Sequence, residues 1–429
     1  MKFIYDAVVS LLRKSPLLSS FEIDEVSGIR LSNDPKKVIK DVIGATGEVS
    51  SLVYSEHFLK LYQDLSLEKR ISLLKHLLNE YDLDLAALQL AITEYTEDPT
   101  ADGMAQISNF SEPKWQTLFR RLNATADGSV RMVRLREDIL KSRREHPDLS
   151  RLDVSIHELF VTLFNPGYLV LQPIDWSTPA EILEKIIAYE AVHEIESWDA
   201  LRARLAPKDR RCFAFFHLAM PDEPLIFVEV ALTDGIPTTI DEVLKQDREH
   251  LDENQVTTAV FYSISNCQRG LVGVSFGNFL LKQVIQELQD EIPSLDTYVT
   301  LSPVPGFARW LSEHQPDLSL QLSKDSWVND HKKYRDKISE AMSRYILVSD
   351  RKDLSANDPV ARFHLGNGAS VHKLNHMGDT SVNGIKQSAG MMINYLYDLK
   401  DIEENHESYS RNKEIKSSAA VKKLLKSST

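Results

Sequence analysis

The chain has 429 residues, which predicts two or three domains because single domains usually hold about 100–200 residues. Asp and Glu outnumber Lys and Arg by 63 to 50, and the resulting formal charge of −13 disfavours nucleic acid as a general partner. No apolar run approaches the ~20 residues that span a bilayer, and two cysteines cannot build a disulfide scaffold. The N-terminus has no pattern of a secretory or organelle address, so we expect a cytoplasmic protein without a membrane partner.

The first 160 residues predict helix after helix, with few β-branched runs. Apolar residues recur there at the spacing of one helical face: Leu67, Ile71, Leu74 and Leu78, and again Leu85, Leu88 and Ile92. Breaks between helices are predicted at three pairs: Asp98-Pro99, Asp102-Gly103 and Asp127-Gly128. This pattern favours a helical bundle that serves packing or self-association rather than catalysis.

The character of the sequence changes near Asn165-Pro166-Gly167. The segment Thr178-Pro179-Ala180-Glu181 has the form of a capping box, with its Thr as N-cap and its Glu reaching back. It predicts the start of a helix. Two strand-like runs, Cys212 to Leu218 and Leu225 to Leu232, flank a turn-rich segment and predict a β-hairpin.

A strand–helix–strand unit is predicted next. Thr258 to Ile264 and Thr297 to Leu301 are the expected strands, with a helix from about Phe279 to Gln289 between them. Four apolar residues lie on one face of that helix: Leu280, Val284, Ile285 and Leu288. The pattern is typical of a βαβ-like unit within a mixed sheet. From Asp401 the chain is charged and serine-rich, which predicts a helix-prone or loose tail.

The loop from Gln268 to Asn278 contains three glycines, at Gly270, Gly273 and Gly277. Glycine lets backbone N–H groups approach a phosphate without a Cβ in the way, and the following helix N-terminus adds partial positive charge. The loop therefore fits a pyrophosphate cradle, although it is neither the dinucleotide fingerprint nor a Walker loop. A plain glycine-rich turn is the alternative interpretation.

Ser302 follows directly on the last predicted strand, in Leu301-Ser302-Pro303. Open α/β sheets place their ligand crevices at the carboxyl ends of strands, so this serine is a candidate site residue. The alternative is that Ser302 only caps the short helix that contains Phe307.

His364 stands beside a Gly-Asn-Gly turn. His372 and His376 follow, but Gly366 and Gly368 would interrupt any helix that carried all three, and no H-E-x-x-H motif occurs. A metal site is therefore not expected. The nucleophile elbow G-x-S-x-G is also absent, so a Ser/His/Asp hydrolase has no local support.

Taken together, the second half of the chain resembles the malonyl-CoA decarboxylase family. The resemblance covers roughly residues 160 to 400, and the helical first part is also similar to the family's N-terminal domain. It rests on five segments in order and spacing: Phe261-Tyr262-Ser263-Ile264-Ser265, Gln268 to Gly277, Leu301-Ser302-Pro303-Val304-Pro305-Gly306-Phe307, Phe363 to Ala369, and Ser388 to Tyr397.

The resemblance implies an α+β protein, in which an N-terminal all-helical bundle precedes a mixed α/β catalytic domain of the GNAT-type N-acetyltransferase fold. We expect a helical oligomerisation domain in residues 1–160, the catalytic domain in residues 161–400 and a charged tail in residues 401–429. Family members form homo-oligomers through the helical domain, and a tetramer is expected here, with a dimer as the alternative.

The resemblance also implies an enzyme that converts malonyl-CoA to acetyl-CoA and CO₂ without a metal or other cofactor. Ser302, His364 and Tyr397 map onto the family's catalytic residues. The CoA-binding residues map onto the glycine-rich loop: Gly270, Val272, Gly273, Val274, Ser275, Phe276, Gly277 and Asn278. Relatives often carry Glu in place of Ser275, so the polar groups around the catalytic residues are expected to differ here.

Loss of CO₂ from a 3-oxo acid thioester leaves an enolate that the enzyme must stabilise and protonate at C2. Ser302 is expected to orient the leaving carboxylate or the carbonyl. His364, with an ordinary pKa near ~6.5, is expected to donate the proton while Tyr397 orients its ring. Which of Ser302 and His364 contacts the leaving carboxylate stays open.

Two other functions fit the same sequence features. An acyl-CoA N-acyltransferase would share the fold but needs a base and a cleft for an amine, which nothing in the sequence marks. A non-catalytic sensor of CoA thioesters would need the loop but has no need of both Ser302 and His364.

Overall fold

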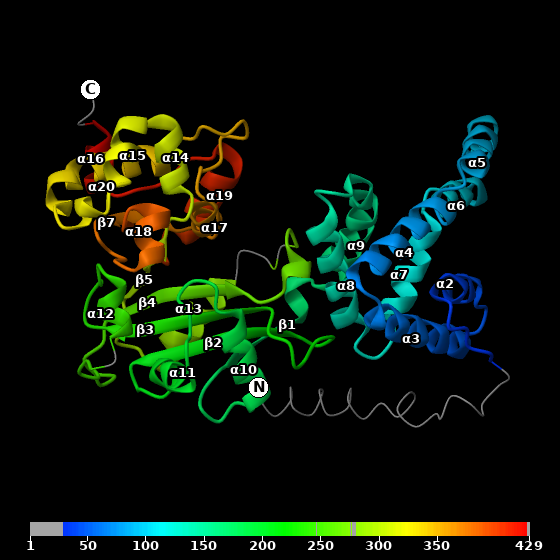
Figure 1. Ribbon diagram of the computed structural model, residues 1–429, viewed down its shortest axis with the longest axis horizontal. Coiled ribbons are helices and arrows are strands. Elements are labelled where there is room, and N and C mark those ends of the chain that lie inside the picture. The colour runs from blue at the N-terminus through cyan, green and yellow to red at the C-terminus, as the bar shows by residue number, and fades with distance from the viewer. Residues whose placement is uncertain (1–28, 246, 275, 277–279, 427–429) are drawn as a thin grey trace. The chain divides into compact units, whose positions relative to one another are not determined.

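The computed structural model describes residues 29–426 except 246, 275 and 277–279. The chain forms two compact units, and Figure 1 traces both along the chain. The helical unit combines the chain up to Val170 with two later segments, Phe216–Glu223 and Gln268–Ser275. The sheet unit holds the remaining residues. The predicted ranges 1–160, 161–400 and 401–429 stay a prediction as domain boundaries.

The helical unit is built of amphipathic helices joined by short turns. They are α2 (Pro35–Gly44), α3 (Glu48–Asp64), α4 (Leu67–Glu80), α5 (Leu85–Glu97), α6 (Ala101–Phe110), α7 (Lys114–Asn123), α8 (Gly128–Ser142), η1 (Pro147–Leu149), α9 (Ser150–Leu163), η2 (Pro166–Tyr168) and η3 (Arg269–Leu271). Trp115, Phe119 and Phe160 are among its fully buried core residues. The predicted helical first part is therefore confirmed.

Two local predictions for these helices are wrong. The buried face of α4 is Leu73, Leu74, Leu77 and Leu78, whereas Leu67 is 45% exposed. Asp102-Gly103 is not a break, because Thr100 caps α6 by accepting the Gly103 N–H and so places both residues in its first turn. Asp98-Pro99 does lie between α5 and α6, and Asp127, with a left-handed φ of 54°, is the N-cap residue of α8, which begins at Gly128.

Within the described residues, eight strands form one mixed sheet in the order β1-β2-β3-β4-β5-β8-β6, with β7 beside β8. The strands are β1 (Leu169–Pro173), β2 (Arg210–His217), β3 (Ile226–Thr233), β4 (Thr258–Asn266), β5 (Thr297–Thr300), β6 (Ser302–Pro303), β7 (Ser370–Asn375) and β8 (Met392–Leu396). The predicted hairpin is β2 and β3, which pair antiparallel with Cys212 opposite Glu229. The α+β class with helices before a mixed sheet is confirmed.

The predicted βαβ-like unit is β4, α13 (Leu280–Glu291) and β5. The two strands are parallel, and α13 buries the apolar face that the sequence indicated. Their ladder runs only from Thr258 opposite Thr297 to Phe261 opposite Thr300, whereas β4 continues to Asn266. Because β5 ends at Thr300, the part of β4 from Tyr262 to Asn266 has no partner in β5.

The other helices of the sheet unit are α10 (Ala180–Tyr189), α11 (Trp198–Leu205), α12 (Ile240–Leu244), α14 (Phe307–His314), α15 (Pro316–Leu322), η4 (Asp325–Val328), α16 (His331–Leu347), α17 (Pro359–Gly366), α18 (Val382–Ser388), α19 (Ile402–Asn412) and α20 (Ala419–Lys426). Figure 1 draws α14 to α20 gathered around β7, in yellow to red. No described helix is long and apolar enough to cross a membrane.

The segment from Asp401 forms two packed helices and is not a loose tail. The Tyr409 hydroxyl of α19 accepts a hydrogen bond from the Ala356 N–H at 3.0 Å. Ser343 of α16 donates to the Val421 carbonyl of α20 at 3.0 Å. The charged and serine-rich composition of this segment is typical of an exposed surface, and it gave no indication of the buried contacts that hold the two helices.

The predicted capping box before α10 does not form. Thr178 Oγ1 accepts a hydrogen bond from the Asp175 N–H, and Glu181 pairs with Lys185 one turn further on. Pro179 is the N-cap residue, and no side chain caps the helix. The Asp175–Thr178 turn competes for the threonine hydroxyl, which is the usual alternative to capping for this residue type.

Candidate active site

Ser302 opens β6, two residues beyond the end of β5 at Thr300, and is opposite Ile393 of β8. Its side chain is 5% exposed. Ser302 Oγ lies 2.8 Å from Thr300 Oγ1 and 3.0 Å from His364 Nε2. The alternative role as a helix cap is wrong, because Gly306 is the N-cap residue of α14.

His364 lies on α17 and reaches both of the other predicted catalytic residues. Its Nε2 contacts Ser302 Oγ, and its Nδ1 is 2.8 Å from the Tyr397 hydroxyl. Both His364 and Tyr397 are buried. Three side chains from distant parts of the sequence are thus joined in one hydrogen-bonded chain, although their catalytic roles stay predictions.

Asp358 fixes α17 relative to the turn that follows Ser302. Its Oδ1 caps α17 by accepting the N–H groups of Val360 at 2.8 Å and Ala361 at 3.2 Å. Its Oδ2 accepts the Gly306 N–H and the Tyr345 hydroxyl, each at 3.2 Å. Burial raises the pKa of this carboxyl. Asp358 therefore links the serine-bearing turn to the histidine-bearing helix.

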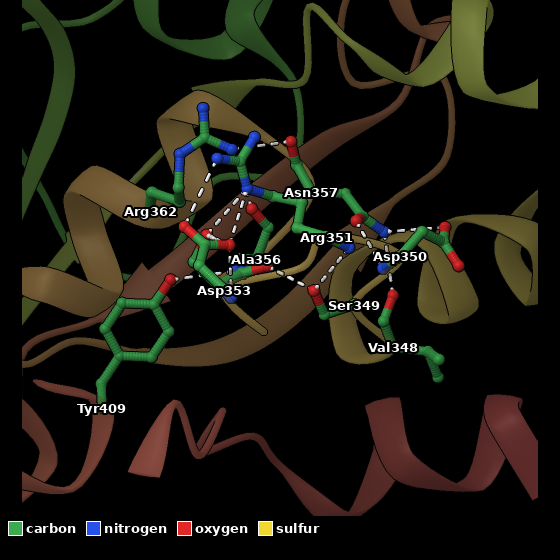
Figure 2. A network of polar contacts seen from close by, with 10 residues as sticks. Val348, Ser349, Asp350, Arg351, Asp353, Ala356, Asn357, Arg362 and Tyr409 are labelled. Atoms are coloured by element: carbon green, nitrogen blue, oxygen red, sulfur yellow. Dashed lines mark hydrogen bonds and ion pairs between the residues drawn. The ribbon is translucent and has the colours of Figure 1, made fainter. Parts of the chain in front are cut away.

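The loop before α17 is held by the polar network that Figure 2 shows. Asn357 Nδ2 donates to the Val348 carbonyl at 2.8 Å. Arg362, on α17 itself, donates back to the carbonyls of Ala356 at 2.8 Å and Asn357 at 2.9 Å. These contacts satisfy buried backbone groups just upstream of the helix and fix the direction in which α17 carries His364.

The electrostatic state of His364 differs from the sequence prediction. Burial lowers its pKa to about 3, so the imidazole is neutral at neutral pH in the ligand-free protein. Its ring stacks on Tyr395, with centroids 4.6 Å apart and an angle of 27° between the planes. The unperturbed pKa near ~6.5 therefore does not apply to this ring, because the sequence could not show that this histidine is buried among aromatic rings.

Ser302 and His364 line a pocket of about 220 Å³ in the sheet unit. The pocket opens where β4 extends beyond its ladder with β5, and Phe261, Ile264 and Phe363 contribute to its walls. Drug-sized ligands usually occupy about 300–1,000 Å³, so this volume suits a small acyl group. The Ser302 hydroxyl and the His364 imidazole are polar groups of the pocket wall, together with the side chains of Tyr262 and Asn266.

Two glycines in the described part of the glycine-rich loop, Gly270 and Gly273, are explained by the local structure. A Cβ on Gly270 would lie 2.1 Å from the Val133 carbonyl oxygen of α8, and the Gly270 carbonyl accepts a hydrogen bond from Arg136 at 2.8 Å. Gly273 has a φ of +85°, which L side chains rarely adopt. Gly270 therefore permits close packing between the loop and a helix of its own unit.

The remaining loop residues are either hydrogen-bonded within the loop, buried, or outside the described residues. The N–H groups of Val272 and Val274 donate within the loop, to the carbonyls of Arg269 and Leu271. Phe276 is buried. Three of the predicted CoA-binding residues lie outside the described residues: Ser275, Gly277 and Asn278. The CoA-binding role of the whole segment stays a prediction.

A second pocket, of about 170 Å³, has basic walls that include Arg204, Arg210 and Arg248. These charges already have partners. Arg204 pairs with the fully buried Glu229 at 2.9 Å, and Arg248 holds Asp209, which also lies beside Arg210. The arrangement is a buried ion network that fixes the start of β2, and we assign it no ligand.

Among the described residues, no group of three or more His, Cys, Asp and Glu side chains could hold a metal ion. His376, which follows His364 by 12 positions in the sequence, lies beside His331, with His376 Nε2 and His331 Nδ1 3.2 Å apart. Both cysteines, Cys212 and Cys267, are buried, and no disulfide joins them.

Sequence reasoning missed three residues that contact the site. Thr300 and Tyr395 flank Ser302 and His364, and Asp358 joins their supporting segments. Asp358 left a signal, since Asp followed by Pro is a typical helix start. Thr300 and Tyr395 have no pattern that marks them as site residues, because both are typical strand residues, although Tyr395 lies within the Ser388 to Tyr397 segment that carries the resemblance.

Comparisons with known proteins cover both parts of the chain. Residues 81–164 match the family model "Malonyl-CoA decarboxylase N-terminal domain", and residues 167–429 match "Malonyl-CoA decarboxylase C-terminal domain". The mitochondrial malonyl-CoA decarboxylase of Anser anser anser is 33% identical over 414 residues, which cover 86% of this chain and 82% of the relative.

Two crystal structures of bacterial relatives are similar along nearly the whole chain. The malonyl-CoA decarboxylase of Rhodopseudomonas palustris shares 43% identity and a TM-score of 0.88, over 92% of this chain and 100% of its own. That of Agrobacterium vitis shares 44% identity and a TM-score of 0.86, over 91% and 99%. Fold, site and relatives together define an enzyme of the carboxy-lyase class. More narrowly, the chain belongs to the malonyl-CoA decarboxylase family.

Proposed function

We propose that this enzyme converts malonyl-CoA to acetyl-CoA and CO₂ in the pocket between β4, β6 and α17. The observation that carries the proposal is the Ser302–His364 contact of 3.0 Å at the wall of a pocket sized for a small acyl group. The family match supports the substrate, since the relatives named above are malonyl-CoA decarboxylases.

The reaction breaks the bond between C2 and the carboxylate carbon of the malonyl group. The electron pair of that bond passes into the thioester as an enolate, and CO₂ leaves. Ser302 and the Nε2 side of His364 face the acyl group, so they hold its polar end and turn the breaking bond out of the thioester plane. A well-placed donor to a developing oxyanion contributes ~3–4 kcal/mol to such a step.

The enolate then takes up one proton at C2, and this proton must come from outside the substrate. His364 is neutral in the ligand-free protein, because burial lowers its pKa. A malonyl carboxylate beside the ring would favour the imidazolium, since an opposite charge within ~4–6 Å raises the pKa of a histidine. Substrate binding therefore favours protonation of His364, and the enolate later receives this proton. Tyr397 keeps the ring oriented.

The CoA part is proposed to bind along Gly270 to Asn278. The support is the family resemblance of this segment and the positive φ of Gly273, which presents bare main chain. No metal or other cofactor takes part in the proposed reaction, which needs only donors and one proton.

The proposal is tested by incubating the purified protein with malonyl-CoA and measuring acetyl-CoA and CO₂. Equal amounts of both products without any added amine are expected, and they would exclude the N-acyltransferase. Binding of malonyl-CoA without product would favour the sensor and overturn the proposal. The His364→Asn variant is the negative control, because it keeps the fold while removing the imidazole.

Assembly and location stay predictions. The expected homo-oligomer, a tetramer with a dimer as alternative, is supported by apolar side chains exposed on α5 and α6, where Leu85 is 68% and Leu90 60% exposed. The expected cytoplasmic location is not tested by the goose relative, whose name describes that protein as mitochondrial.

A further inference from the structure

The Thr300 side chain lies behind Ser302 and is fully buried at the end of β5. Its Oγ1 accepts two hydrogen bonds, from the Tyr395 N–H at 3.1 Å and from Ser302 Oγ at 2.8 Å. A backbone N–H can only donate, so one acceptor position of Thr300 is committed to β8. The other acceptor position determines where the Ser302 hydroxyl proton points.

The backbone around Thr300 is fixed by the same strand. Asn394, which is fully buried on β8, donates from Nδ2 to the Thr300 carbonyl at 2.8 Å. Asn394 Oδ1 in turn accepts from Asn375 Nδ2 at 2.7 Å. Both the main chain and the hydroxyl of Thr300 are therefore held by adjacent residues of β8, which leaves Thr300 Oγ1 little freedom to turn.

The direction of the Ser302–Thr300 bond decides which nitrogen of His364 carries a hydrogen. Ser302 has one hydroxyl proton, and it points to Thr300. Its oxygen can then only accept from His364 Nε2, 3.0 Å away. A neutral imidazole has a single N–H, so Nδ1 must accept the Tyr397 hydroxyl proton across 2.8 Å.

We propose that Thr300 is a positioning residue that holds His364 in the tautomer with its hydrogen on Nε2, on the side of the acyl pocket. The opposite tautomer would present a lone pair to the negative carboxylate of the acyl group and would repel it. The Nε2–H tautomer places a donor on this side instead, and in the ligand-free protein this N–H is directed to Ser302 Oγ. The catalytic consequence rests on the proposed decarboxylation, whereas the tautomer itself does not.

The test is the tautomer of His364, measured by nuclear magnetic resonance on protein labelled with ¹⁵N-histidine. The His364 signal is identified by its loss in His364→Asn. We expect the Nε2–H form in the parent protein and in Thr300→Ser, which keeps the hydroxyl. In Thr300→Val, Ser302 loses its acceptor and turns its proton to Nε2, so the Nδ1–H form should appear. Thr297→Val, on the same strand but outside this chain of bonds, should change nothing.

Kinetics supply the second readout. Thr300→Val should lower kcat by ~10–100-fold, toward the range for loss of an acid–base group, with KM for malonyl-CoA unchanged. Thr300→Ser should restore kcat. An Nδ1–H tautomer in the parent protein, or an unaltered Nε2–H tautomer in Thr300→Val, would overturn the inference. A parent protein with the Nε2–H form but no activity on malonyl-CoA would instead refute the proposed function alone.

Discussion

Ser302 Oγ and His364 Nε2 lie 3.0 Å apart although their residues are 62 positions apart in the sequence. β6 carries the serine and α17 carries the histidine, and the two elements meet through Asp358, which caps α17 and binds the turn after Ser302. The closeness of the two side chains therefore depends on how the elements are joined.

Removal of the imidazole should greatly reduce turnover without weakening ligand binding. His364→Asn is expected to lower kcat by ~10²–10⁴-fold, the usual effect of losing a general acid, while the affinity for acetyl-CoA stays near that of the parent protein. Steady-state kinetics and calorimetric titration of acetyl-CoA measure the two quantities. A near-normal kcat would remove His364 from the mechanism.

Asp358 should tolerate Asn better than Ala. Asp358→Ala removes the cap of α17 and the link to Gly306, and loss of a helix cap alone typically costs ~1 kcal/mol. Asp358→Asn keeps an oxygen for the cap, and the buried site already disfavours the charged carboxylate. We expect Asp358→Ala to lose both stability and kcat, and Asp358→Asn to keep most of each. Equal effects of the two substitutions in urea denaturation and kinetics would contradict this role.

The stability of the ligand-free protein should report the buried state of His364. Burial lowers its pKa to about 3, below the ~6.5 of the unfolded chain, so the unfolded chain takes up this proton first as the pH falls. The free energy of unfolding should therefore decrease between about pH 6.5 and 3. His364→Gln lacks this proton, and its profile should be shallower by up to ~1.4 kcal/mol per pH unit.

The comparison of the two proteins is needed because other buried groups titrate as well. Glu229, whose pKa burial raises to about 7, acts in the opposite sense, and His193, with a pKa lowered to about 4, acts in the same sense. Both are present in the parent protein and in the variant, so the difference isolates His364. Parallel profiles in urea denaturation would show that the ring is solvated.

The two described glycines of the loop should respond differently to substitution. In Gly270→Ala the added Cβ meets the Val133 carbonyl oxygen, so the helical unit should lose stability by ~1–3 kcal/mol, as overpacking usually costs. Gly273→Val forces a β-branched residue into a φ of +85°, where its Cβ would meet His157 at an ordinary contact distance of 3.5 Å, and should displace the loop. We expect Gly273→Val to weaken acetyl-CoA binding with little change in thermal midpoint. Loss of stability in Gly273→Val and weaker acetyl-CoA binding in Gly270→Ala would instead show that the roles of the two glycines are reversed.

The exposed apolar side chains of α5 give a test of assembly. Leu90 is 60% exposed, and a charge at this position should lower the mass of the oligomer if α5 lies in the subunit interface. Light scattering of Leu90→Lys measures this mass. Val382→Lys, at an 88% exposed position on α18, is the matched control and should leave the mass unchanged. An unaltered mass of the oligomer in Leu90→Lys would exclude this face of α5 from the subunit interface.

Several elements were predictable from the sequence because their signals are local. The hairpin of β2 and β3 and the unit of β4, α13 and β5 follow from strand-like runs, turn residues and the apolar spacing of α13. The resemblance carried by short motifs also placed Ser302, His364 and Tyr397 in one site before any distance was known. Order and spacing along the chain suffice for such conclusions.

Only the tertiary structure decided how these residues are used. The Thr178 hydroxyl bonds to Asp175 instead of capping α10, Gly270 makes room for Val133 of α8, and burial keeps the His364 imidazole neutral in the ligand-free protein. The sequence determined which segments become helices and strands and which side chains are available for chemistry, because periodicity and propensity are properties of neighbouring residues. Burial, hydrogen-bond partners and pKa depend on residues brought close from distant segments, and no local pattern contains them.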